Sequence, residues 1–126
     1  MKGNVMADTL YTRLGGYDAI AAVADNLLPR LMGDPRLGRF WQHRADDSLH
    51  REKQLLIDFL CASAGGPLLY VGRDMKSSHK GMHIDEGDWQ VFRDHLEATL
   101  DAFKVPAVER AAVLAFIDST KADIVE

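Results

Sequence analysis

Two histidines, His79 and His83, lie four residues apart in the stretch GRDMKSSHKGMHI, residues 72–84. On a continuous helix this spacing would place both imidazoles on one face, which is one way proteins build a zinc site. Gly81 interrupts the helix between them, and no glutamate of the HExxH type accompanies them. The spacing alone therefore does not specify a zinc site.

His79 can also be considered as a single metal ligand. Met75 precedes it by one helical turn, Ile84 follows it, and Trp89 and Phe92 open the next apolar segment. A neutral imidazole framed by large apolar side chains suits an axial iron ligand, because a haem macrocycle needs apolar walls. An ordinary helical core shows the same apolar stripe, so both interpretations stay open at this point.

Composition narrows the function classes. The chain has 126 residues with 15 Lys and Arg against 19 Asp and Glu, a formal charge of −4. This balance lacks the basic footprint of a nucleic-acid-binding domain. The basic residues Arg36, Arg39, Arg44 and Arg51 are scattered, and we expect a solvated face there. No GxGxxG or P-loop pattern supports nucleotide binding.

Cysteine usage and hydropathy bear on the compartment. Cys61 is the lone cysteine and sits in the apolar run IDFLCASA, so it predicts a buried thiol and excludes an intramolecular disulfide. No apolar run approaches the ~20 residues that span a bilayer. The N-terminus lacks the apolar segment of a secretory signal. We therefore expect a cytoplasmic protein without membrane insertion.

Apolar periodicity predicts an all-α domain. The helices are expected over residues 18–32, over 46–64 with Asp47 or Ser48 as the cap, from Asp85, and from Pro106 through Ile124. Gly65 and Gly66 should end the second helix. Residues 68–84 form a long irregular connection with one short helical candidate, DMKSSHKG, at 74–81. Such a connection is usually functional, and this one contains the histidines.

Several motifs together identify a family resemblance. The stretches TLYTRLGGYDAIAAVADNLL, DPRLGRFW and FLCASAGGPLLYVGRDMKSSHKGM resemble the truncated haemoglobins of group I, and the match runs over residues 9–123. The resemblance implies a globin-like, truncated two-over-two helical sandwich around haem b. It divides the chain into an N-terminal tail, 1–8, and a globin domain, 9–126.

The resemblance also implies positions at the cofactor. His79 matches the proximal iron ligand, and Trp41 matches the aromatic residue that wedges against the haem face. Met75, Ile84 and Trp89 match the proximal wall. The distal wall is matched by Leu28, Leu56 and Leu60. The implied function is reversible binding of O2, NO and CO, in oxygen handling or in NO detoxification, where a dioxygenase-type activity would need a separate reductase.

The distal side departs from the family. Group I proteins usually carry Phe-Tyr where this chain has Leu27-Leu28, and that tyrosine donates a hydrogen bond to iron-bound oxygen. Leu55 and Leu56 also stand where glutamine or threonine is common. A missing donor should weaken O2 binding by about 1 kcal/mol or more and should affect CO and NO less. We therefore expect faster O2 release than in tyrosine-bearing members.

Other polar side chains lie near the distal positions in sequence. Glu52 falls at the gate position, and Gln54 is turned about 100° from Leu55 on a helix. A local shift would be needed to bring Gln54, Lys53 or His50 into the pocket. Two alternatives remain: a haem-based redox or sensor protein with His43 or His50 as sixth ligand, and a haem-free helical domain.

Overall fold

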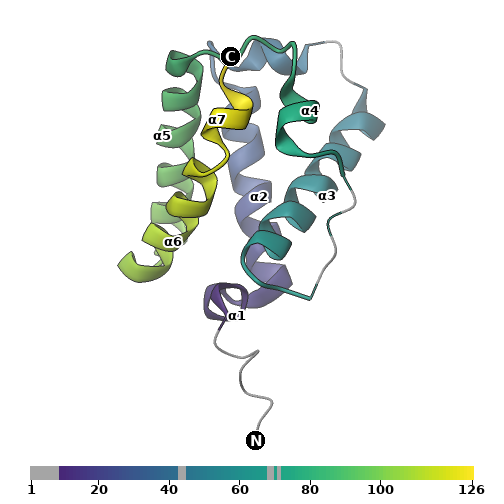
Figure 1. The fold of residues 1–126 in the computed structure, drawn as a ribbon. Coiled ribbons are helices and arrows are strands. Elements are labelled where there is room, and N and C mark those ends of the chain that lie inside the picture. The colour runs from purple at the N-terminus through teal and green to yellow at the C-terminus, as the bar shows by residue number, and fades with distance from the viewer. Residues whose placement is uncertain (1–8, 43–44, 68–69, 71) are drawn as a thin grey trace, which may run out of the picture.

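The computed structural model describes residues 9–42, 45–67, 70 and 72–126, which form helices and loops without a strand (Figure 1). The elements are α1 (Leu10–Leu14), α2 (Gly16–Met32), the 3-10 helix η2 (Gly38–Trp41), α3 (Asp46–Ser63), α4 (Met75–His79), α5 (Glu86–Ala102), α6 (Ala107–Asp118) and α7 (Lys121–Ile124). The predicted all-α class is confirmed. The predicted tail, 1–8, lies outside the described residues.

Helix α2 is the centre of the core. Its buried residues are Ile20, Ala24, Leu27 and Leu31, whose spacings of three and four make one apolar stripe. This helix packs against both α3 and α5. Each large apolar side chain that is fully buried stabilises the fold by about 1.5–3 kcal/mol. The other core residues are Leu37, Ile57, Leu60, Cys61, Trp89, Leu96, Leu100, Val113 and Ile117.

Glycines end two helices, and Gly65 does so where the sequence predicted a break. Gly15 has a φ of 109°, caps α1 and directly precedes α2. Gly65, at a φ of 89°, follows the C-cap of α3, and the next residue's N–H donates to the Cys61 carbonyl at 2.9 Å. Glycine adopts this left-handed conformation without the cost that a Cβ imposes. The chain can therefore reverse sharply at both ends of the core.

Two details of the predicted helices are wrong. Ala45 is the N-cap of α3 and makes no side-chain cap bond, so Asp47 and Ser48 lie inside the helix instead of capping it. The last helix is not continuous to Ile124. It ends at Asp118, and the hydroxyls of Ser119 and Thr120 donate back to main-chain carbonyls. Such bonds compete with the helical ladder and favour a break.

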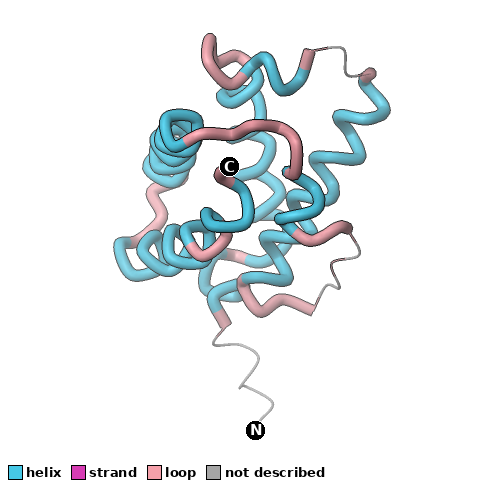
Figure 2. Tube along the Cα trace, turned by 45° about the horizontal axis from the view of Figure 1, so that its top comes forward, coloured by secondary structure: helices cyan, strands magenta, loops and turns pink. Residues whose placement is uncertain are grey.

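The irregular connection contains one short helix, as predicted. Helix α4 covers Met75–His79, and the Asp74 side chain caps it by accepting from the Ser77 N–H at 2.9 Å. From His79 the chain crosses above the C-terminus to reach α5 (Figure 2). Helix α5 then begins with a capping box in which Asp85 and Asp88 satisfy each other's main-chain N–H.

Candidate functional site

His79 is the last residue of α4 and is half-buried. Its Nδ1 atom lies 2.8 Å from the Met75 carbonyl and 2.9 Å from the Ser78 hydroxyl. Because a carbonyl only accepts, the Met75 bond requires the proton on Nδ1. No described residue is hydrogen-bonded to Nε2. Metal-bound histidines commonly donate their other ring N–H to a carbonyl in this way, so the His79 donor set fits iron ligation through Nε2.

Helix α4 is held mainly by α7, and Figure 1 shows it in front of α2 and α3. Beyond His79, the Gly81 N–H donates to the Glu126 carboxylate at 2.6 Å, and the Glu126 N–H donates to the Ile84 carbonyl at 2.8 Å. Among the described residues, Met75 and Ile84 are half-buried yet do not join the core cluster. These apolar side chains are therefore available to line a flat apolar cofactor.

His83 does not share a helix face with His79. Helix α4 ends at His79, Gly81 has a φ of 84°, and His83 itself has a φ of 57°. The His83 side chain is 88% exposed, and its nearest charged partner is Glu126 at 3.5 Å. Within the part of the chain that the structure describes, no group of three His, Cys, Asp or Glu side chains could hold a metal ion.

Helical spacing defines one face of α3, the face that contains the predicted distal residue Leu56. Glu52, Leu56 and Phe59 recur at four and three residues and so share one face. The Phe59 ring meets that of Tyr70 at a centroid distance of 5.5 Å, so this face turns toward the segment that leads to α4. Leu60 lies on the adjacent core side and is 7% exposed. The structure thus separates the two predicted distal leucines of α3.

Gln54 and Lys53 point toward α2. The Gln54 amide donates to the Tyr17 hydroxyl at 2.9 Å and to Asp58 at 3.0 Å, and the Lys53 ammonium lies 2.8 Å from Asp25. These partners hold the two side chains against α2, and helical spacing turns Gln54 away from the Leu56 face. The shift that would bring them into a distal pocket is not present.

The remaining polar candidates differ in placement. His50 is exposed in the first half of α3, and His43 lies outside the described residues. Glu52 is half-buried, and its Oε2 atom is buried. Glu52 shares a face of α3 with Leu56, four residues later. The predicted gate position therefore holds a carboxylate close to apolar neighbours.

The predicted aromatic wedge, Trp41, ends η2 and packs against the core together with Phe40. The two rings meet edge-to-face with centroids 6.4 Å apart. The Arg39 guanidinium lies 4.2 Å above the Phe40 ring centroid, a cation–π contact. Trp89, predicted for the proximal wall, is buried in the core at 6% exposure and meets the Phe92 ring at 5.4 Å.

Sequence reasoning missed a charged cluster beside this wedge. Asp88 is 1% exposed, and it accepts from Arg36 Nε and from Arg39 Nη2, each at 2.7 Å. Arg36 Nη2 also donates to Asp85 at 2.9 Å. The two arginines are about half exposed, as a solvated face predicts, but they bind a buried carboxylate. The signal in the sequence was the Asp85–Asp88 capping spacing.

The charge of this cluster persists in mild acid. Burial raises the pKa of Asp88, but the hydrogen bonds from Arg39, Arg36 and the Asp85 N–H outweigh it and hold that pKa well below its ordinary 3.8. A second contact joins the same regions, because His95 Nε2 lies 2.7 Å from Asp34. The hydrogen bonds from His95 and from the Arg36 N–H lower the pKa of Asp34.

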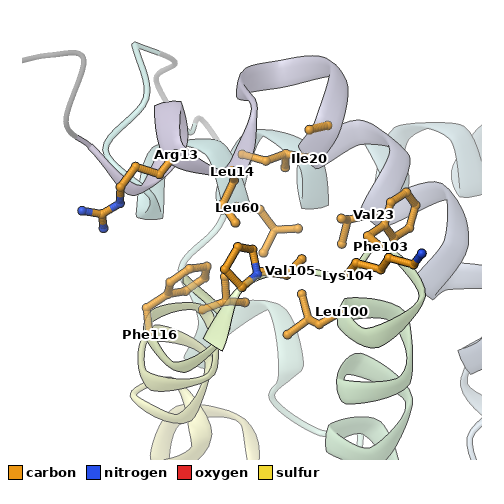
Figure 3. Close-up of a pocket in the computed structure, with 13 residues that line it drawn as sticks. Arg13, Leu14, Ile20, Val23, Leu60, Leu100, Phe103, Lys104, Val105 and Phe116 are labelled. Atoms are coloured by element: carbon orange, nitrogen blue, oxygen red, sulfur yellow. The ribbon is translucent and has the colours of Figure 1, made fainter. Parts of the chain in front are cut away.

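A separate apolar cavity of about 210 Å³ lies between α1, α2, α3 and the segments where α5 ends and α6 runs (Figure 3). Leu14, Ile20 and Leu60 line one side, and Val105 and Phe116 line another. No residue of α4 contributes to its wall. Leu60 therefore faces this cavity from the core side of α3.

Comparisons with known proteins agree with this geometry. The model of the bacterial-like globin family matches residues 9–126. A "Group 1 truncated hemoglobin" of Mycolicibacterium paratuberculosis is 30% identical over 109 residues, covering 86% of this chain and 78% of that protein. One from Tetrahymena pyriformis is also 30% identical, over 92% and 93%.

The chain belongs to the group 1 truncated haemoglobins. In structure it is similar to the Fe(III) form of a Tetrahymena pyriformis truncated hemoglobin mutant, with a TM-score of 0.86, 27% identity and coverage of 94% and 98%. The predicted two-over-two fold is therefore confirmed, as is haem with iron as the cofactor of this truncated haemoglobin. Haem-based binding of diatomic gas follows from the family. No described helix is long and apolar enough to cross a membrane.

Proposed function

We propose that this truncated haemoglobin holds haem b through His79 Nε2 and consumes nitric oxide by dioxygenation. The single observation that carries the proposal is the His79 Nδ1 bond to the Met75 carbonyl at 2.8 Å. That bond orients the ring and places its lone pair on Nε2. Haem held in this way would supply an iron atom that can bind one diatomic gas molecule.

The side chains around the cofactor have distinct roles in this proposal. Met75, Ile84 and Trp89 form the proximal wall, and Trp41 wedges the haem at the edge of η2. Leu28, Leu56 and Leu60 form the distal wall, with Leu60 reaching it from the core side. Their apolar character excludes water from the cofactor, which keeps ferrous iron from oxidation.

The distal wall determines ligand preference. Gln54 and Lys53, the nearest amide and ammonium groups on α3, are held by Tyr17 and Asp25. Bound O2 carries partial negative charge and gains on the order of 1 kcal/mol or more from a hydrogen-bond donor, whereas NO and CO gain less. We therefore expect rapid O2 exchange and little penalty for NO.

Nitric oxide dioxygenation joins NO and O2 to nitrate and takes up one electron, so each turnover needs a reductase as partner. The cytoplasm, predicted from the sequence, would provide one. The reaction also needs an apolar entry for NO. The cavity lined by Leu14, Ile20 and Leu60 supports such an entry, because Leu60 borders both the cavity and the proposed distal wall.

The first experiment tests the iron ligand. We expect the purified protein to show a Soret band and a five-coordinate ferrous spectrum that converts fully with CO. His79→Leu should lose haem or scramble its spectra. His83→Leu is the matched control, because His83 is exposed and lies beyond the end of α4. Equal spectra for the two variants would contradict the assignment of His79.

The second experiment tests the reaction. With O2, a reductant and a reductase, we expect NO to disappear and nitrate to form in equal amounts. A ferrous spectrum that is six-coordinate without added ligand would instead favour the histidine-ligated sensor. If NO binds but no nitrate forms under turnover, gas binding stands and dioxygenation fails.

A further inference from the structure

We propose that the charged cluster of Arg36, Arg39, Asp85 and Asp88, here called the corner clamp, positions the Phe40–Trp41 wedge and thereby controls haem retention. The inference rests on the proposed placement of haem between this wedge and His79. Asp88 is its central positioning residue. No direct contact between the clamp and haem is required.

The first step is the link from Asp88 to the wedge. Arg39 donates to Asp88 Oδ2 at 2.7 Å while its guanidinium lies 4.2 Å above the Phe40 ring. A single side chain therefore connects a buried carboxylate to the aromatic pair. Arg39 also donates from Nη1 to the Arg36 carbonyl. The guanidinium thus fixes both the main chain before η2 and the ring within it.

The second step is the link from the corner to the chain beyond His79. Asp88 lies in the first turn of α5, and Asp85 caps that helix six residues after His79. Arg36 bonds both aspartates, at 2.7 and 2.9 Å. The segment that carries the Phe40–Trp41 wedge is therefore attached to the start of α5, which the chain enters soon after His79.

The buried charge of Asp88 makes these contacts energetically important. Surface ion pairs contribute little, but Asp88 is 1% exposed, and removing one partner of a buried charge pair is costly. Asp88 also accepts from the Asp85 N–H at 3.1 Å. Its three hydrogen bonds thus go to the cap of α5 and to the two arginines beside η2. Loss of its charge should release the corner while the rest of the helix keeps its ladder.

The absence of a side chain at Gly87 leaves room for the Arg36 guanidinium to reach Asp85 and Asp88. A Cβ at this position would lie 2.8 Å from the Cζ atom of Arg36. The side chain of Arg36 therefore crosses α5 at Gly87, which has no side chain of its own. Alanine there would displace Arg36 but favours the helix more than glycine does.

The test compares Asp88→Asn with Asp118→Asn in the haem-loaded protein. Asp118 accepts from Arg93 at 2.7 and 2.8 Å where α5 meets α6, and its side chain is 43% exposed, so this pair is an arginine–carboxylate contact without the buried charge. The measurements are the rate of hemin transfer to an excess of an apo-haem acceptor, the Soret circular dichroism, and the free energy of unfolding. We expect Asp88→Asn to lose haem about tenfold faster and to alter the Soret dichroism, since one charge-assisted hydrogen bond corresponds to about that factor.

Two further variants keep the inference testable if Asp88→Asn folds poorly. Arg39→Met keeps an apolar stem over Phe40 but removes the guanidinium, and should also speed hemin loss. Gly87→Ala should speed hemin loss by about threefold, less than a full charge-assisted bond would give, while the free energy of unfolding stays close to that of the wild type. Faster loss from a variant that is not globally destabilised would support the clamp.

Other outcomes overturn it. If hemin loss follows the free energy of unfolding across all four variants, the cluster acts only on general stability. Unchanged loss from Asp88→Asn, Arg39→Met and Gly87→Ala would likewise refute the clamp while leaving the proposed function intact. Failure of the wild-type protein to bind haem through His79 would instead refute the proposed function.

Discussion

The two sides of the proposed haem site are built differently. On the proximal side, His79 is oriented by a main-chain carbonyl one turn back in its own short helix, and the segment after it is tied to Glu126. On the distal side, Leu28 and Leu56 offer no hydrogen-bond donor. Under the proposed function the difference would separate two tasks: the proximal contacts would hold the cofactor, and the distal surface would select the gas.

The distal side is apolar although polar groups lie close to it in sequence. Glu52 shares the face of Leu56 on α3. Gln54 donates to Tyr17 and Lys53 pairs with Asp25, and both interactions stabilise the contact of α3 with α2. The Gln54 amide and the Lys53 ammonium thus stabilise the packing of α3 on α2. The variants below test this contrast.

The largest effect is expected on the proximal side. His79→Leu removes the only ligand that this proposal gives to the iron, so haem affinity should fall by orders of magnitude or the bound haem should take a foreign ligand. Hemin titration followed by absorption spectroscopy measures this. Affinity within a few fold of the wild type would show that another side chain holds the iron.

A large effect of opposite kind is expected on the distal side. Leu28→Tyr would place a hydroxyl donor where the wall is apolar, and O2 release should slow by about tenfold to a hundredfold, as a hydrogen bond to a charged group predicts. Stopped-flow measurement of O2 dissociation tests it. Leu28→Phe is the control for ring volume, and equal rates for the two variants would show that position 28 does not face the ligand.

The corner clamp predicts a pH dependence. The folded pKa of Asp88 lies below its ordinary 3.8, so its stabilising effect is complete above that value and is lost as the pH falls toward the folded pKa. Asp88→Asn should lower the free energy of unfolding by about 1.5 kcal/mol at pH 6, because the arginines are half exposed. Urea unfolding from pH 6 to pH 3 should show that difference shrink below 3.8; a constant difference would contradict it.

The smallest effect is expected for Gln54→Leu. This change removes the bonds to Tyr17 and Asp58 but no donor to the ligand, so O2 release should change by less than about twofold. The same stopped-flow assay measures it, with Leu28→Tyr as the positive comparison. A tenfold acceleration would mean that Gln54 reaches bound O2 and that the distal side is polar after all.

Much of the fold could be predicted from local patterns, whereas the role of His79 was implied by the family resemblance and stays a proposal. The apolar stripe of α2, the glycine stop at Gly65 and the short helix before His79 all depend on neighbours a few residues apart. The break after Asp118 was missed because it depends on whether two hydroxyls bond to the main chain. The capping of α3 was misjudged by a few residues for a similar reason. The roles of the predicted haem-lining residues remain proposals.

Local sequence was enough to predict which segments become helices, that His79 follows Met75 by one turn, and that leucines occupy the proposed distal positions. These properties are local, because helical spacing and side-chain chemistry do not depend on distant partners. Only the tertiary structure decided that Arg36 and Arg39 bind Asp88, 52 and 49 residues away. It also decided that Leu60 turns toward the core cavity and that Gln54 bonds Tyr17. Such pairings depend on how helices pack, and the same arginines would have been solvated side chains on any surface without a buried carboxylate.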